Sequence, residues 1–248
     1  MENTRLVLLH GAGLGAWVWK KVEPLLQMPS VSVDFPDRDR YKPDHSQDLD
    51  SYCRSILDAI SRWPREKVIL VAHSISGVVA CRLATELGDR LVAFAGISAV
   101  VPDKGGSFLS AFPFAQRAIT WITMSLGGTR PPNSQIVKAY CNDLTREECD
   151  QVLTRYVPES LLLYTQPTEH LLPANIPKFY IKLTKDRSLD ESNQQRMIKH
   201  MGADRVTSVE AGHLAMISEP RKVAEALNNF FDHSPKSKSK KTLDPVHP

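Results

Sequence analysis

The sequence predicts an α/β fold with a mostly parallel central sheet that is flanked by helices. Short continuous apolar runs recur along the chain, and segments with the apolar period of an amphipathic helix lie between them. Strands that alternate with helices are typical of a parallel sheet covered on both faces. Six runs are expected to form buried strands: residues 6–9, 31–33, 68–71, 91–97, 179–183 and 206–209.

Three segments between and after these runs have the clearest helical pattern. Residues 47–62 place their apolar side chains on one helical face. Residues 78–87 form a second predicted helix, which ends at Gly88, where glycine commonly follows the last turn. The last predicted helix covers residues 219–231, with Ser218 as its N-cap.

The alternation fails between the fourth and fifth apolar runs. This stretch contains two Gly-Gly pairs and a Pro-Pro pair, and it is too long for a loop in a compact domain. We therefore expect a cap at about residues 101–173, inserted into one domain over residues 1–233. The core would comprise about residues 1–100 and 174–233. Residues 234–248 are rich in lysine and proline without periodicity and are expected to be disordered.

The composition and net charge exclude several classes of protein. The 248 residues are 42% hydrophobic, and a globular domain of this length needs neither disulfides nor metals to fold. The net charge of +3 is small, which argues against a nucleic-acid partner. The N-terminus does not resemble a signal peptide, and no apolar stretch reaches the ~20 residues of a membrane span. The four cysteines lack metal-ligand spacing, so we expect packed, reduced thiols and no bound metal. We expect a soluble, cytoplasmic protein that has no cofactor and no membrane partner.

A candidate nucleophile lies at the end of the third strand. The apolar run 68–71 leads through Ala72 to Ser74, and a predicted helix follows at once. A sharp strand–turn–helix holds the serine hydroxyl at the carboxyl edge of the sheet, where the N–H of Ile75 faces a developing oxyanion. Glycine is usual two residues before and two after such a serine, whereas this chain has Ala72 and Ser76. Both are small, so the turn is expected to close.

An oxyanion site needs a second N–H donor, which a glycine-rich turn after a neighbouring strand can supply. The run Gly11-Ala12-Gly13 follows the first predicted strand. We assign the donor to Ala12. His10, just before this turn, is interpreted as a structural residue.

The candidate base is His213, which lies after the last strand and before the last helix. An imidazole there reaches the sheet edge that carries Ser74 and can take the proton of its hydroxyl. The acid that orients the imidazole should follow the preceding strand, where the chain has Asp186 and Asp190. Asp190 lies deeper in the loop and fits better as the N-cap of a helix over residues 191–201, so Asp186 is preferred.

Seven motifs in combination carry a resemblance to a known family. They are His10-Gly11-Ala12, Gly15-Ala16-Trp17, the turn at 72–77, Cys141-Asn142-Asp143-Leu144, Val157-Pro158-Glu159, Thr184-Lys185-Asp186 and Gly212-His213-Leu214-Ala215-Met216. Over residues 4–231 the chain resembles the α/β-hydrolase branch of plant methyl esterases, hydroxynitrile lyases and their microbial esterase relatives. The resemblance implies an α/β-hydrolase fold with a small helical cap inserted after the sixth strand. It also implies a Ser74–His213–Asp186 triad and oxyanion donors at Ala12 and Ile75.

The predicted function is a cofactor-free serine carboxylesterase that hydrolyses small apolar or aromatic carboxylic esters through an acyl-enzyme. Its partner would be the small-molecule ester. The sequence is also compatible with a homodimer. The predicted pocket residues are Phe112, Trp121, Met124 and Leu214.

Two alternatives share the fold, which by itself excludes neither. One is a carbon–carbon lyase of the hydroxynitrile type, and the other is a receptor that binds a small ligand without useful turnover. The lyases that this chain resembles have threonine or asparagine at the position of Ala12. One group of them also has lysine after the catalytic histidine, where this chain has Leu214.

Overall fold

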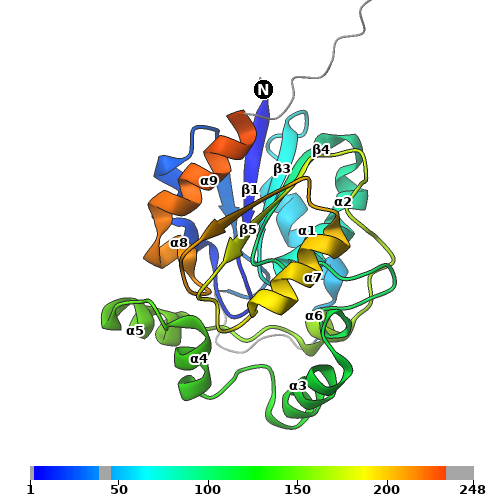
Figure 1. The fold of residues 1–248 in the computed structure, drawn as a ribbon. Helices are drawn as coiled ribbons and strands as arrows, with labels where there is room; N and C mark the ends of the chain where they lie inside the picture. Colours follow the sequence, from blue (N-terminus) through cyan, green and yellow to red (C-terminus); the bar gives the residue numbers. More distant parts are fainter. Residues whose placement is uncertain (1–2, 39–45, 233–248) are drawn as a thin grey trace, which may run out of the picture.

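The computed structural model describes residues 3–38 and 46–232, whose strands form one six-stranded sheet (Figure 1). All neighbouring strands are parallel, in the order β2-β1-β3-β4-β5-β6. Each of the six apolar runs forms a strand, so the predicted parallel sheet is confirmed. The strands are β1 (Thr4–Leu9), β2 (Ser30–Val33), β3 (Lys67–His73), β4 (Leu91–Ile97), β5 (Lys178–Leu183) and β6 (Arg205–Val209).

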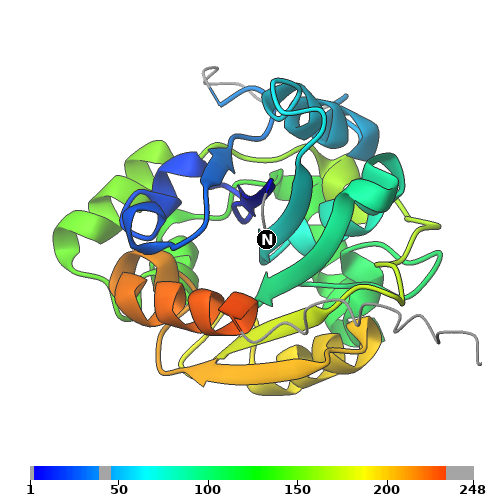
Figure 2. The same ribbon diagram turned by 90° about the horizontal axis from the view of Figure 1, so that it is seen from above.

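Helices cover both faces of the sheet (Figure 2). Because side chains alternate along a strand, Leu9 of β1 packs on one face and Leu8 on the other. The face of Leu9 packs against α1 (Leu49–Ala59), α2 (Ser76–Leu87) and α7 (Glu191–Met201). The face of Leu8 packs against α8 (Ala215–Ser218) and α9 (Pro220–Asp232). In the described ranges, no helix combines the length and the apolar character needed to cross a bilayer.

Local signals set the ends of these helices. Asp48 caps α1, because its Oδ1 accepts a hydrogen bond from the Ser51 N–H at 2.8 Å. Gly88 follows α2 with a φ of +49°, which costs glycine little. The predicted N-cap at Ser218 is wrong: Ser218 is the last residue of α8, and its hydroxyl donates to Asp143 Oδ2 at 2.9 Å.

A long helical segment separates β4 from β5. It lies beyond the edge where the strands end, as α3, α4 and α5 show in Figure 1. The segment follows β4, the fourth strand of the described sheet, rather than a sixth strand, since only β5 and β6 come after it. The residue boundaries of a core and a cap stay a prediction. The α-helices of the segment are α3 (Phe114–Gly127), α4 (Asn133–Tyr140), α5 (Arg146–Arg155) and α6 (Leu161–Thr165).

Short 3₁₀ turns complete the described elements. They are η1 (Ala16–Trp19), η2 (Glu23–Leu25), η3 (Gly88–Arg90) and η4 (Leu109–Ala111).

All four cysteines are free thiols. Burial raises the pKa of Cys53 and Cys81 to about 12, so both stay protonated at neutral pH. These two residues behave as the packed thiols that the sequence predicts.

Two histidines are fully buried at the ends of β1 and β3. The ring of His10 bonds at both nitrogens: Nδ1–H donates to the Gly11 carbonyl at 2.8 Å, and Nε2 accepts from the Phe35 N–H at 3.1 Å. His73 Nε2–H donates to the backbone carbonyl of His213 at 2.9 Å. Burial is the main cause that holds the pKa of both rings well below its usual value. The folded protein therefore keeps both rings neutral at neutral pH.

This arrangement predicts a loss of stability on mild acidification. Below about pH 6.5 the unfolded chain binds protons at both rings while the folded chain resists them, so stability is full above pH 6.5 and falls below it. Between the two pKa values, each ring should lower the free energy of unfolding by up to about 1.4 kcal/mol for each pH unit of acidification. His10→Gln should reduce the pH dependence by the share of one ring. The test is urea unfolding of both proteins at pH 7.5, 6.0 and 5.0. Identical slopes in the two proteins would contradict the prediction.

Candidate active site

Ser74 lies in the tight turn between β3 and α2. Its φ is +57°, a left-handed conformation that is uncommon for a residue with a side chain. The turn is bound to the neighbouring strand: the Ser74 N–H donates to the Ile97 carbonyl at 3.2 Å, and the Val100 N–H donates to the Ser74 carbonyl at 2.8 Å. The backbone conformation of Ser74 is therefore fixed by β4 and the residues after it.

Close packing explains why small residues surround the turn. A Cβ atom at Gly77 would collide with the carbonyl oxygen of Val100. Ser76, which replaces the usual glycine, is also accommodated: its hydroxyl donates to the His73 carbonyl at 2.8 Å and contacts the Leu9 carbonyl at 3.2 Å. The departure from the usual glycine thus adds hydrogen bonds to the ends of β3 and β1.

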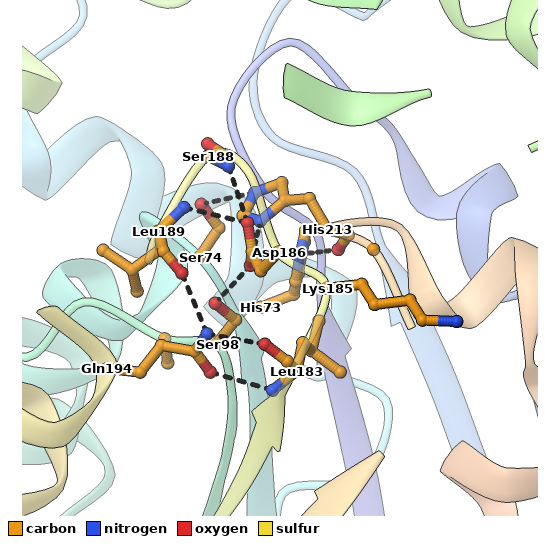
Figure 3. Close-up of polar contacts among 12 residues, drawn as sticks. His73, Ser74, Ser98, Leu183, Lys185, Asp186, Ser188, Leu189, Gln194 and His213 are labelled. Atoms are coloured by element: carbon orange, nitrogen blue, oxygen red, sulfur yellow. Dashed lines mark hydrogen bonds and ion pairs between the residues drawn. The ribbon is translucent and has the colours of Figure 1, made fainter. Parts of the chain in front are cut away.

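Three predicted residues meet at the carboxyl edge of the sheet (Figure 3). His213 Nε2 lies 3.2 Å from Ser74 Oγ, and His213 Nδ1 lies 2.7 Å from Asp186 Oδ2. The side chains of His213 and Asp186 are buried, so water does not weaken their contact. Because a carboxylate only accepts, Nδ1 carries the proton and Nε2 is left to accept from the serine hydroxyl.

Asp186 is held by several donors at once. Oδ1 accepts from the N–H groups of Ser188 and Leu189 at 2.7 and 2.8 Å, and Oδ2 also accepts from Ser98 Oγ at 2.7 Å. Burial by itself raises the pKa of this carboxyl. The electrostatic attraction of His213 and the hydrogen bonds from the donors of Asp186 outweigh burial, so the pKa lies below its usual value. Asp186 is therefore ionised at neutral pH.

Asp190, the competing acid, has other partners. Its Oδ1 accepts from the Asn193 N–H at 2.8 Å and from Ser192 Oγ at 2.8 Å, so it caps α7. The predicted helix over residues 191–201 and its cap are both confirmed. Of the two aspartates, Asp186 is the one that bonds to His213.

Two aromatic rings pack against His213. The ring centroid of His73 lies 4.6 Å from that of His213, and the ring centroid of Tyr140 lies 5.0 Å from it. Sequence reasoning missed His73, Tyr140 and Ser98 as neighbours of the site. The sequence contains a signal for two of these neighbours. His73 directly precedes Ser74 at the end of the third predicted strand, and Ser98 directly follows the fourth predicted strand. Tyr140 had none, because it comes from the inserted segment.

The predicted oxyanion donors lie on two adjacent loops. Ile75 directly precedes α2, and Ala12 lies between Gly11 and Gly13 after β1. Within the described ranges, neither amide donates a hydrogen bond to another group of the protein. Backbone N–H groups of this kind are available to an anionic oxygen.

A buried carboxylate anchors the loop that carries Ala12. The Gly13 N–H donates to Glu159 Oε1 at 2.9 Å, and the Val157 N–H donates to the Gly13 carbonyl at 3.0 Å. Glu159 is only 2% exposed, forms an ion pair with Arg38, and accepts from Tyr52 Oη at 3.0 Å. Sequence reasoning missed this role, because Glu159 lies 146 residues from Gly13.

The predicted pocket residues do not form one wall. Leu214 is fully buried in the cluster on the α8–α9 face of the sheet. Phe112 and Met124 pack partly buried against the cluster on the opposite face. Trp121 of α3 is 51% exposed. Their part in a substrate pocket stays a prediction.

The described residues hold no group of three or more histidine, cysteine or acidic side chains that could bind a metal ion. Ser74, His213 and Asp186 bond to one another. The geometry provides a hydroxyl, an imidazole and a carboxylate in one hydrogen-bonded chain, beside two backbone donors.

Comparisons with known proteins agree with this fold. Polyneuridine aldehyde esterase from Rauvolfia serpentina is 24% identical in an alignment of length 259, which covers 93% of this chain and 97% of that protein. An extracellular alpha/beta-hydrolase from a Paenibacillus species superimposes with a TM-score of 0.80 at 19% identity, over 91% of this chain and 98% of that one. A pyrethroid hydrolase from Sphingobium faniae JZ-2 superimposes with a TM-score of 0.75 at 21% identity, over 93% and 98% of the two chains.

The sequence model of one family, described as the alpha/beta hydrolase family, matches residues 6–226. This match covers the sheet from Leu6 of β1 to the end of β6, together with the loops that carry Ser74, Asp186 and His213. The chain therefore belongs to the alpha/beta hydrolase family.

Proposed function

We propose that this protein is a serine carboxylesterase that hydrolyses small apolar or aromatic carboxylic esters without a cofactor or metal. The observation that carries the proposal is the buried chain of contacts from Ser74 Oγ through His213 to Asp186, with distances of 3.2 and 2.7 Å. The similarity to an enzyme named an esterase along 93% of the chain supports the reaction class.

The proposed reaction has two halves. Ser74 Oγ attacks the ester carbonyl while His213 Nε2 takes its proton, and the protonated imidazole then gives that proton to the leaving alcohol. A water molecule, activated by the same nitrogen, attacks the acyl-enzyme and releases the carboxylic acid and free Ser74. One ester and one water are thus converted into one acid and one alcohol.

The neighbouring groups have defined roles in this scheme. Asp186 holds the His213 ring in the tautomer that leaves Nε2 able to accept, and it stabilises the imidazolium that forms. The N–H groups of Ala12 and Ile75 would bind the oxyanion of the tetrahedral intermediate. Both are backbone donors held by packed loops, so they need little reorganisation when the charge develops.

The proposal extends to the surroundings of the site. The helices between β4 and β5 would cap the substrate, and Phe112 and Met124, which pack partly buried against the core, would line the pocket. Ile119, Ile122 and Leu126 of α3 are exposed and apolar, and they are three and four residues apart, so they lie on one face of the helix. We propose that this face packs against the same face of a second copy in a homodimer. The cytoplasm remains the proposed location.

The nucleophile can be tested by covalent labelling. A fluorophosphonate should add to Ser74 Oγ, which peptide mass spectrometry would locate. Ser74→Ala should remove the label and lower kcat for an aryl ester by about 10⁶-fold. The control is Ser125→Ala, which changes an exposed serine of α3 and should leave both unchanged. Labelling at another residue, or an active Ser74→Ala variant, would end the proposal.

The acid can be tested with two matched substitutions. Asp186→Asn should lower kcat by about three to four orders of magnitude, because an amide can favour the wrong tautomer of His213. Asp190→Asn should change kcat little, since asparagine also caps helices well. Steady-state kinetics on one aryl ester measures both. The reverse pattern would show that the acid is assigned wrongly.

A third test separates the esterase from the lyase and the receptor. Cyanohydrin cleavage needs polar groups to stabilise departing cyanide, whereas Ala12 ends in a methyl group and Leu214 is buried and apolar. We expect ready hydrolysis of 4-nitrophenyl acetate and negligible cleavage of mandelonitrile by the same preparation. Comparable rates on the two compounds would favour the lyase. Absence of turnover on any simple ester would favour the receptor.

A further inference from the structure

The inserted segment contacts the two loops that carry the proposed base and acid. Asn142 and Asp143 lie between α4 and α5. Asn142 Nδ2–H donates to the Lys185 carbonyl at 3.1 Å, and Asp143 Oδ2 accepts from the Gly212 N–H at 2.6 Å. Lys185 directly precedes Asp186, and Gly212 directly precedes His213. Two consecutive side chains therefore hold the residues next to both members of the pair.

Packing at Gly212 leaves little freedom for this contact. A Cβ atom there would collide with Asp143 Oδ1 and would lie 2.8 Å from Asn142 Oδ1. A side chain at this position would force Asp143 or Asn142 to shift. Asp143 Oδ2 also accepts from Ser218 Oγ at 2.9 Å, which ties the same carboxylate to the end of α8.

The two loops also bond directly to each other. The Lys185 N–H donates to the Ala211 carbonyl at 3.0 Å. The Thr184 N–H likewise donates to the Val209 carbonyl at 3.0 Å, so these two bonds continue the pairing of β5 with β6. The contacts of Asn142 and Asp143 attach the residues beyond these bonds to the inserted segment, and Tyr140 of the same segment packs its ring against His213.

We propose that Asp143 is a positioning residue that fixes the His213 loop against the Asp186 loop, with Asn142 as its partner on the acid side. Its function is to keep His213 Nδ1 at 2.7 Å from Asp186 Oδ2 while Nε2 faces Ser74. The kinetic part of this inference rests on the proposed esterase function, whereas the structural part does not. Misplacement of reacting groups by about 1 Å can cost about 100-fold in rate.

Three variants test the proposal. Asp143→Ala removes the acceptor for Gly212 and should lower kcat by about 10- to 100-fold, with KM changed less than about twofold. Asp143→Asn keeps an oxygen that can accept from the same N–H and should recover most of the lost kcat. Asp150→Ala is the matched control, because it removes an exposed carboxylate from α5 of the same segment and leaves the bonds of Asp143 in place. Its kcat should equal that of the unmodified protein.

A spectroscopic measurement separates this proposal from the proposed function. The proton between His213 Nδ1 and Asp186 gives a far-downfield ¹H NMR signal, which does not depend on turnover. The signal should be broadened or lost in Asp143→Ala and retained in Asp150→Ala. If the unmodified protein hydrolyses no ester, the esterase proposal fails while the NMR comparison still tests the positioning role. An unchanged signal in Asp143→Ala, or a kcat loss that Asp143→Asn does not recover, would overturn it.

Discussion

The left-handed turn at Ser74 is the constraint on which the rest of the site depends. A φ of +57° is unfavourable for serine, and such a conformation persists only where its surroundings determine it. Here the Ser74 amide and carbonyl are bonded to Ile97 and Val100. The absence of a side chain at Gly77 lets α2 approach the Val100 carbonyl closely enough for these bonds to form. The position of the hydroxyl therefore follows from the packing of β3, β4 and α2.

Polar side chains of the segment between β4 and β5 join the loops around this turn. Glu159 bonds to the loop after β1, Asn142 to the loop after β5, and Asp143 to the loop after β6. Each of these loops leaves a different strand, so no element of the sheet alone sets their mutual positions. The segment is thus part of the framework of the site.

Sequence reasoning reached the residues that occupy ends of strands. The apolar periodicity located the strands, and Ser74, Asp186 and His213 each follow one, so a parallel sheet must bring them to one edge. It missed Ser98 as a partner of Asp186, and it missed Glu159 and Asp143, whose bonds span 146 and 69 residues without any periodic signal. The role of α3 stays a prediction, because apolar spacing on a helix is the same whether a residue such as Trp121 faces a pocket, the core or solvent.

Burial gives the site its distribution of charge. Because a charge is costly in a buried environment, His10 and His73 remain neutral, and each has a backbone partner that suits the neutral ring. Asp186 is the exception, since two backbone N–H groups, Ser98 and His213 compensate its charge. All of these bonds stabilise the ionised carboxylate and hold the Nδ1 proton in place. In the proposed reaction the proton change is then confined to Nε2 of His213, on the side that faces Ser74.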